Sequence, residues 1–121
     1  MDRAPAQRFE DLIVWQKSHA VTLAVYRTTL DFPRHELYGL TAQMRRAAVS
    51  VAANIAEGFK RRSKADKARV MNIAQGSLEE LRYDFVLARD LDYWKQPRFA
   101  EVDEVGRLLT AYIRSLVGTE S

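Results

Sequence analysis

Apolar residues recur every three to four positions along most of this chain, which is the spacing of α-helices with one buried face. Pro33 disfavours helix at the residue before it and ends the first periodic stretch. Pro97 follows the third stretch in the same way. The pattern therefore predicts four helices, over residues 12–30, 40–57, 64–91 and 99–117.

Residues typical of helix ends frame these stretches. Asp11 is expected to cap the first helix, and Ser63, with Asp66 three residues later, to cap the third. Gly58 stands where a left-handed residue closes a helix, and Gly118 follows the last one. No strand pattern, repeat or low-complexity segment is present, and short links make successive helices antiparallel. The fold class is all-α: one domain over residues 1–121, an up-down-up-down antiparallel four-helix bundle.

Each predicted helix has a stripe of apolar residues that we expect to face the core. In chain order the four stripes are Leu12, Trp15, Leu23, Tyr26 and Leu30; Leu40, Met44, Ala47, Ala48, Val51 and Ile55; Val70, Ala74, Ser77, Leu78, Leu81, Phe85 and Ala88; and Val102, Val105, Leu109, Tyr112, Ile113 and Leu116.

The first two helices also carry a second apolar stripe, which a helix with one solvated face does not need. On the first helix it consists of Val14, Val21 and Val25, and on the second of Ala42, Val49, Ala53 and Ala56. Apolar surface left over after the core is assigned suggests a subunit interface. We therefore predict a homo-oligomer that uses Val14, Val21, Val25, Ala42, Val49 and Ala53; the alternative is that these are scattered surface residues.

A polar stripe runs between the two apolar stripes of the second helix. It comprises Gln43, Arg46, Ser50, Asn54 and Glu57. Buried polar groups need partners, and the third helix offers Gln75 and Glu80 among others. Gly76 is expected to allow a close approach to the second helix. We interpret the set as a structural polar network, the alternative being a polar pocket in which Glu57 or Glu80 acts in chemistry.

Composition narrows the functional classes. The 121 residues are 47% hydrophobic and 29% charged, as in folded soluble domains, and include no cysteine. No apolar run approaches the roughly 20 residues of a membrane span, and the N-terminus lacks the apolar segment of a signal peptide. We expect a cytoplasmic protein with no membrane partner.

Motifs for catalysis and metal binding are missing from the sequence. The two histidines, His19 and His35, fall on different elements and form no metal-ligand spacing; His19 is expected near the inward face of its helix. There is no glycine-rich phosphate loop, nucleophile elbow or HExxH motif. We therefore expect no catalytic residues, no metal site and no cofactor, and a non-enzymatic protein.

Positive charge is concentrated between residues 45 and 69, which hold eight of the 19 cations and only two of the 16 acids. The densest part joins the second and third helices, and its cations are Lys60, Arg61, Arg62, Lys64, Lys67 and Arg69. A basic patch beside a helix N-terminus favours phosphate, although a basic loop is often simply solvated. Phe59 is either a stacking platform for a base or a plug over the end of the bundle.

Three blocks of the sequence carry a family resemblance: "FEDLIVWQKSHAVTLAVY", "YGLTAQMRRAAVSVAANIAEGFKRRSK" and "NIAQGSLEELRYDFVLARDL". They resemble the bacterial four-helix-bundle proteins encoded in intervening sequences of large-subunit ribosomal RNA genes. That family is similar to the accessory variability protein of diversity-generating retroelements, a basic pentamer that binds nucleic acid and a reverse transcriptase. The resemblance implies a homopentamer with one bundle per subunit, and it supplies no biochemical activity.

Residues and resemblance together predict a non-enzymatic, oligomeric bundle that binds RNA or DNA through its basic link. The alternative is a protein-interaction scaffold or adaptor whose basic patch binds an acidic protein. Lined-up basic patches of several subunits would favour the first function, whereas an exposed apolar groove would favour the second.

Overall fold

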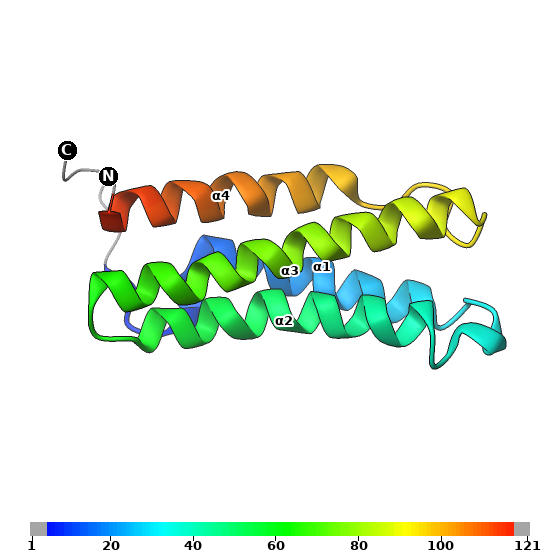
Figure 1. Cartoon of the computed structure of the whole chain (residues 1–121), viewed down its shortest axis with the longest axis horizontal. Helices are drawn as coiled ribbons and strands as arrows, with labels where there is room; N and C mark the ends of the chain where they lie inside the picture. Colours follow the sequence, from blue (N-terminus) through cyan, green and yellow to red (C-terminus); the bar gives the residue numbers. More distant parts are fainter. Residues whose placement is uncertain (1–4, 118–121) are drawn as a thin grey trace.

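The computed structural model describes residues 5–117. Within this range the chain forms four α-helices, two short 3-10 helices and no strand (Figure 1). In chain order these are η1 (Phe9–Asp11), α1 (Ile13–Thr29), η2 (Arg34–Glu36), α2 (Leu40–Lys60), α3 (Lys64–Asp90) and α4 (Phe99–Val117). The four predicted helices are confirmed, and α2 continues three residues beyond its expected end.

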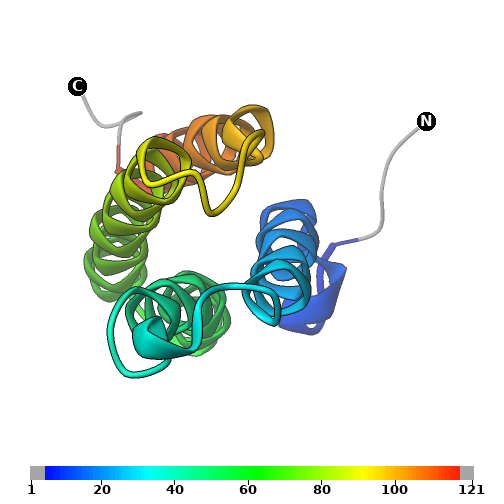
Figure 2. The same ribbon diagram turned by 90° about the vertical axis from the view of Figure 1, so that its right-hand side faces the viewer.

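Successive helices run antiparallel along the length of the molecule (Figure 1). The end view in Figure 2 shows the helices arranged in chain order around the bundle, with α2 between α1 and α3. The most extensive contact joins α2 to α3, and the least extensive contact between helices joins α1 to α4. The predicted class, an all-α four-helix bundle, is therefore confirmed.

The core-facing stripes predicted for the second and third helices are correct. All the residues named for them are buried, and Met44, Ile55, Leu81 and Phe85 are among the most completely enclosed side chains. In α4, Val102, Val105 and Leu109 are buried, and Tyr112 and Ile113 pack against the core at its edge.

The prediction for the first helix is wrong, because its two apolar stripes have exchanged places. Val14, Val21 and Val25 belong to the core and are at most 5% exposed, so they are not available as a subunit interface. Leu23, Tyr26 and Leu30, expected inside, are 38%, 42% and 76% exposed, while Leu12 and Trp15 lie at the edge of the core. His19 is also exposed and stacks on Trp15. Both stripes are apolar, so hydrophobic periodicity did not distinguish them; their shapes did.

Two of the predicted helix-end signals act differently from expectation. Asp11 does not cap α1; its carboxylate accepts hydrogen bonds from the backbone N–H groups of Gln7 and Arg8, and so closes η1. Ser63 does cap α3, since its hydroxyl accepts a bond from the backbone N–H of Asp66. The Gly118 prediction lies outside the described residues.

The roles predicted for the glycines of α2 and α3 are both wrong. Gly58 is not a left-handed terminator; it is buried inside α2, where a Cβ atom would lie 3.0 Å from Cε of Met71 on α3. Gly76, expected to allow this close approach, has open space around it, because no atom lies within 4 Å of a Cβ built there. The side chain of Met71 on α3 therefore packs directly against the α2 backbone at Gly58.

Candidate nucleic-acid interface

The basic link is a tight turn between the last residue of α2 and the first of α3, at one end of the bundle (Figure 1). A shallow hollow of about 770 Å³ lies over it. Its lining is almost entirely polar or charged: Lys60, Arg61, Arg62, Ser63, Ala65, Asp66 and Arg69. Because four of these seven residues are cationic, the hollow is suited to anions.

Arg61 holds the turn closed and is not free for a ligand. Its guanidinium pairs with Glu57 one turn back on α2 and lies 3.6 Å from the carboxylate of Asp66 on α3. The hydrogen bond to Glu57, with Asp66 adding to it, raises the pKa of Arg61. Asp66 also pairs with Arg69 at 2.9 Å. Two of the six predicted phosphate-binding cations are thus already paired with acids of the same chain.

Lys67 is also engaged within the chain. Its ammonium donates to the carbonyl oxygen of Phe59 and lies 5.2 Å from the centre of the Phe59 ring. Carbonyl oxygens at a helix C-terminus carry partial negative charge, so this ammonium compensates the end of α2. Phe59 is only partly exposed and already has a cation over its ring, which favours its interpretation as a plug.

Lys60, Arg62 and Lys64 remain available. All three are exposed, and none forms an ion pair with another residue of the range 5–117. They follow one another through the turn and the first residue of α3, where backbone N–H groups also favour anions. The structure thus divides the predicted basic patch into three cations with partners in the chain and three exposed ones without an ion-pair partner in the described range.

The polar stripe of α2 makes hydrogen bonds to α3 at two levels. Gln43 donates from Nε2 to Oδ1 of Asp84 over 2.5 Å, and the hydroxyls of Ser50 and Ser77 are 2.7 Å apart. Asn54 donates to the carbonyl oxygen of Ser50 at 2.8 Å and to its hydroxyl at 3.1 Å. Gln43 and Ser50 therefore make polar contacts between the two helices, whereas the hydrogen bonds of Asn54 stay within α2.

The other four residues predicted for this network lie elsewhere. Gln75 donates to the hydroxyl of Thr110 on α4 over 3.3 Å, and so joins α3 to a different helix. Glu57 is exposed and pairs with Arg61 as described above. Arg46 and Glu80 are exposed, and no hydrogen bond joins either of them to the network within the described residues.

Asp84, which sequence reasoning missed, is fully buried between α2 and α3. Burial raises the pKa of the Asp84 carboxyl group. The hydrogen bond from Gln43 and the positive charge of Arg46 lower this pKa, and the negative charge of Glu80 raises it further. Oδ2 of Asp84 has no hydrogen-bond partner in the described structure. The residue was detectable, because it follows Ser77 by seven positions and Leu81 by three, and so shares their inward face.

An exposed apolar strip runs along the outer side of α1 and α2. Arg45 joins the helices there: it donates to the Thr29 hydroxyl at 2.8 Å and lies 4.8 Å from the ring centre of Tyr26. On each helix, the residues three and four positions away lie on the surface beside Tyr26 of α1 and Arg45 of α2. They include Leu23 and Leu30 on α1 and Ala42 and Val49 on α2, with Ala53 one turn further. Of the residues predicted for an interface on the second helix, Val49 and Ala53 are therefore exposed and Ala42 is half-buried, and the exposed apolar residues beside them on α1 are Leu23, Tyr26 and Leu30.

Within residues 5–117, no group of three or more histidine, aspartate or glutamate side chains is placed to hold a metal ion. In the same range, no helix combines the length and apolarity needed to cross a membrane.

The fold and the basic turn define a small all-α bundle with an anion-attracting end. A family model, the 23S rRNA-intervening sequence protein, matches residues 10–113, so the chain belongs to that family. The crystal structure of a protein of unknown function from the S23 ribosomal protein family of Bacteroides thetaiotaomicron is similar in fold. Its TM-score is 0.60 at 21% identity, with 88% of this chain and 97% of that one covered. Comparison with curated proteins finds no match.

Proposed function

We propose that this protein is a non-enzymatic, self-associating bundle that binds RNA or DNA through Lys60, Arg62 and Lys64. The observation that carries the proposal is the exposure of these three cations at one end of the bundle, without acidic partners in the described chain. Arg61, Lys67 and Arg69 shape the turn and add to its positive potential, but their own partners occupy them.

Phosphate is the part of a nucleic acid that this surface suits. Lysine and arginine on an exposed turn neutralise phosphates and release counterions, which makes affinity fall as salt rises. No helix presents a row of side chains of the kind that reads base edges in a groove, so we expect binding with little sequence preference.

Self-association would give this weak surface useful affinity. Three free cations per chain are few, but identical turns on neighbouring subunits can contact one polynucleotide together. The apolar strip of Leu23, Tyr26, Leu30, Ala42, Val49 and Ala53 is our proposed subunit contact. The number of five subunits, the likeness to the retroelement accessory protein and the cytoplasmic location stay predictions from the sequence.

The test compares two triple charge reversals. The first replaces Lys60, Arg62 and Lys64 with glutamate, and the control does the same to Arg34, Lys95 and Arg98, which are exposed and lie away from both the α2–α3 turn and the apolar strip. Each takes the formal net charge from +3 to −3, so overall charge is matched. Binding of fluorescent single-stranded RNA, single-stranded DNA and duplex DNA is followed by anisotropy across a salt series.

The parent should lose affinity with a log–log salt slope of about −2 to −3 per bound subunit, from roughly three phosphate contacts. The turn reversal should abolish binding, whereas the control should retain most of it at matched salt. Equal losses in the two variants would show that only net charge matters. That result, or no binding by the parent at low salt, would refute the proposal.

A further inference from the structure

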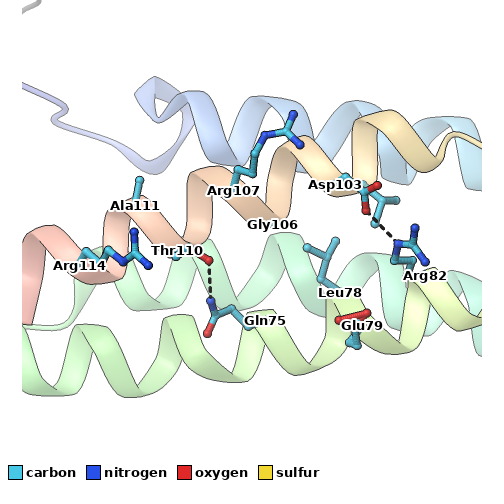
Figure 3. Close-up of a pocket in the computed structure, with 11 residues that line it drawn as sticks. Gln75, Leu78, Glu79, Arg82, Asp103, Gly106, Arg107, Thr110, Ala111 and Arg114 are labelled. Carbon is cyan, nitrogen blue, oxygen red and sulfur yellow. Dashed lines mark hydrogen bonds and ion pairs between the residues drawn. The ribbon is translucent and has the colours of Figure 1, made fainter. Parts of the chain in front are cut away.

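A second surface hollow, separate from the one over the basic turn, lies between α3 and α4. It is a groove of about 600 Å³ (Figure 3). Leu78, Val102, Gly106 and Ala111 supply its apolar part. Two cross-links tie its walls together, from Gln75 to Thr110 at 3.3 Å and from Arg82 to Asp103 at 2.9 Å. The α3–α4 groove is therefore a surface feature with a fixed width.

The charges along the groove are distributed unevenly between its two sides. Arg107 and Arg114 project from α4, one heptad apart, which is about 10 Å along the helix axis. Neither forms an ion pair with another residue of the range 5–117. The α3 side carries Glu79, which is likewise unpaired in that range. One side of the groove thus offers two positive charges and the other a negative charge.

Gly106 is a helix-interior glycine that the packing of its own chain does not require. A Cβ atom there would lie 3.5 Å from Cδ2 of Leu78, an ordinary contact. Glycine in a helix interior costs about 1 kcal/mol relative to alanine. Gly58 is different, because Met71 occupies the space that its side chain would need. The effect of glycine at position 106 is to leave the middle of the groove unfilled.

We infer that the α3–α4 groove is a docking site for one amphipathic helix of a partner protein. Such a helix would place apolar side chains over Leu78, Gly106 and Ala111, and acidic side chains seven residues apart opposite Arg107 and Arg114. A basic residue on its other edge would face Glu79. A groove between two antiparallel helices accepts a third helix, and the charges specify the chemistry of its edges. This inference is independent of nucleic-acid binding, since the two surfaces share no residue.

Two synthetic helical peptides test the inference. Both have about 18 residues, an apolar stripe of leucine and alanine, and a length of about 27 Å. The first carries glutamates seven residues apart on one edge and lysine on the other; the second exchanges glutamate and lysine. Affinity is measured by anisotropy with the full chain, and the binding surface is mapped by amide chemical shifts.

The acidic-edge peptide should bind and shift the amides of Gly106, Thr110 and Gln75, leaving Ser63 and Lys64 unaffected. The exchanged peptide and the Arg107→Glu/Arg114→Glu variant should each bind about tenfold more weakly, because two attractions become repulsions. Gly106→Leu should block the groove while melting no lower than the parent. Lys60→Glu/Arg62→Glu is the control and should bind the peptide normally.

Three results would overturn the inference. The first is equal binding of the two peptides or binding of neither, and the second is insensitivity of the peptide to Gly106→Leu. The third is occupation of the groove by another molecule. A second copy of the chain would be seen as shifts of the groove amides that depend on dilution in the absence of peptide. A nucleic acid would be seen as displacement of the peptide by an oligonucleotide. The first two results, and occupation by a second copy, would leave the salt series on the basic turn unchanged, so the two proposals can fail separately. Displacement by an oligonucleotide would also show in that series, as binding that survives reversal of the turn cations.

Discussion

The α2–α3 and α1–α2 interfaces use the same central helix but are specified differently. α2 and α3 meet at a buried glycine and through paired polar side chains, Ser50 with Ser77 and Gln43 with Asp84. α1 meets α2 mainly through valines and threonines, and the Thr22 hydroxyl donates to the carbonyl oxygen of Ala48 at 3.2 Å. Paired polar side chains and a glycine contact can form in only one register of the two helices. A contact between apolar side chains only requires that apolar residues face the core, and does not specify which ones.

The largest effect should come from testing which face of α1 is inside. Val25→Asp places a carboxylate where the side chain is fully enclosed, and an unpaired buried charge costs about 3–5 kcal/mol. Leu23→Asp, two residues away, should change the free energy of unfolding of the isolated subunit by less than about 0.5 kcal/mol, as is usual for surface sites, so a larger loss would come from lost assembly.

Urea denaturation of both variants measures this difference. Light scattering during gel filtration measures the mass of the oligomer. This measurement is informative only for Leu23→Asp, because that variant should stay folded. If the two variants were equally destabilised, the assignment of the two faces would be wrong. If Leu23→Asp kept the mass of the parent oligomer, the apolar strip would not be the subunit contact.

A second pair of variants tests how close α2 and α3 lie. Gly58→Leu overfills the contact with Met71 and should cost about 1–3 kcal/mol. Gly76→Leu should be neutral or stabilise by up to about 1 kcal/mol, because leucine is a better helix former and has open space there. Thermal melting compares them. A stabilising Gly58→Leu would mean that the helices are further apart than described.

Asp84 should give the α2–α3 interface a pH dependence that α1–α2 lacks. Burial raises the pKa of its carboxyl group, so the folded state holds a proton to higher pH than the unfolded one. The contribution of Asp84 to stability is therefore most favourable at acidic pH and falls as pH rises through its raised pKa. Asp84→Asn should flatten this fall.

Gln43→Ala removes the only hydrogen bond to that carboxylate in the described structure and should steepen the fall. Its cost at neutral pH should be about 1–3 kcal/mol, the usual value for a buried acceptor left unsatisfied. Urea denaturation at several pH values measures how steeply the free energy of unfolding of each variant changes with pH. The range runs from about pH 4, near the ordinary carboxyl pKa, to about pH 8. A parent and an Asp84→Asn variant with identical slopes would contradict this assignment.

The smallest expected difference in stability is between two residues of the α2 polar stripe, Asn54 and Glu57. Asn54→Ala removes two partly buried hydrogen bonds and should cost about 1 kcal/mol. Glu57→Ala removes only an exposed ion pair and should cost less than about 0.5 kcal/mol. It also releases Arg61, so nucleic-acid affinity should rise slightly at low salt. Melting curves and anisotropy of the two variants make the comparison, and a larger loss for Glu57→Ala would reverse our ranking.

How well the sequence predicted the structure depended on the type of residue. Ser63 identified the start of α3 because a hydroxyl before a helix has one favourable use, as an acceptor for the first free N–H groups. Gly58 misled because glycine suits both helix termini and close helix contacts, and only the position of Met71 distinguishes them. The six cations were correctly placed at one end, but a count of charges does not say which of them are already paired.

The sequence by itself determined the class of fold, the number and extent of the helices, and the position of the basic turn. Those properties follow from local periodicity, helix-breaking residues and chain connectivity. Only the tertiary structure decided which stripe of α1 faces inward, which three cations stay unpaired, and that a groove opens between α3 and α4. The face of α1 and the groove depend on contacts with helices that are far away in the chain, which leave no periodic signal. The pairing of the cations depends on the geometry of the turn, which brings Arg61 to Asp66 and Lys67 to Phe59.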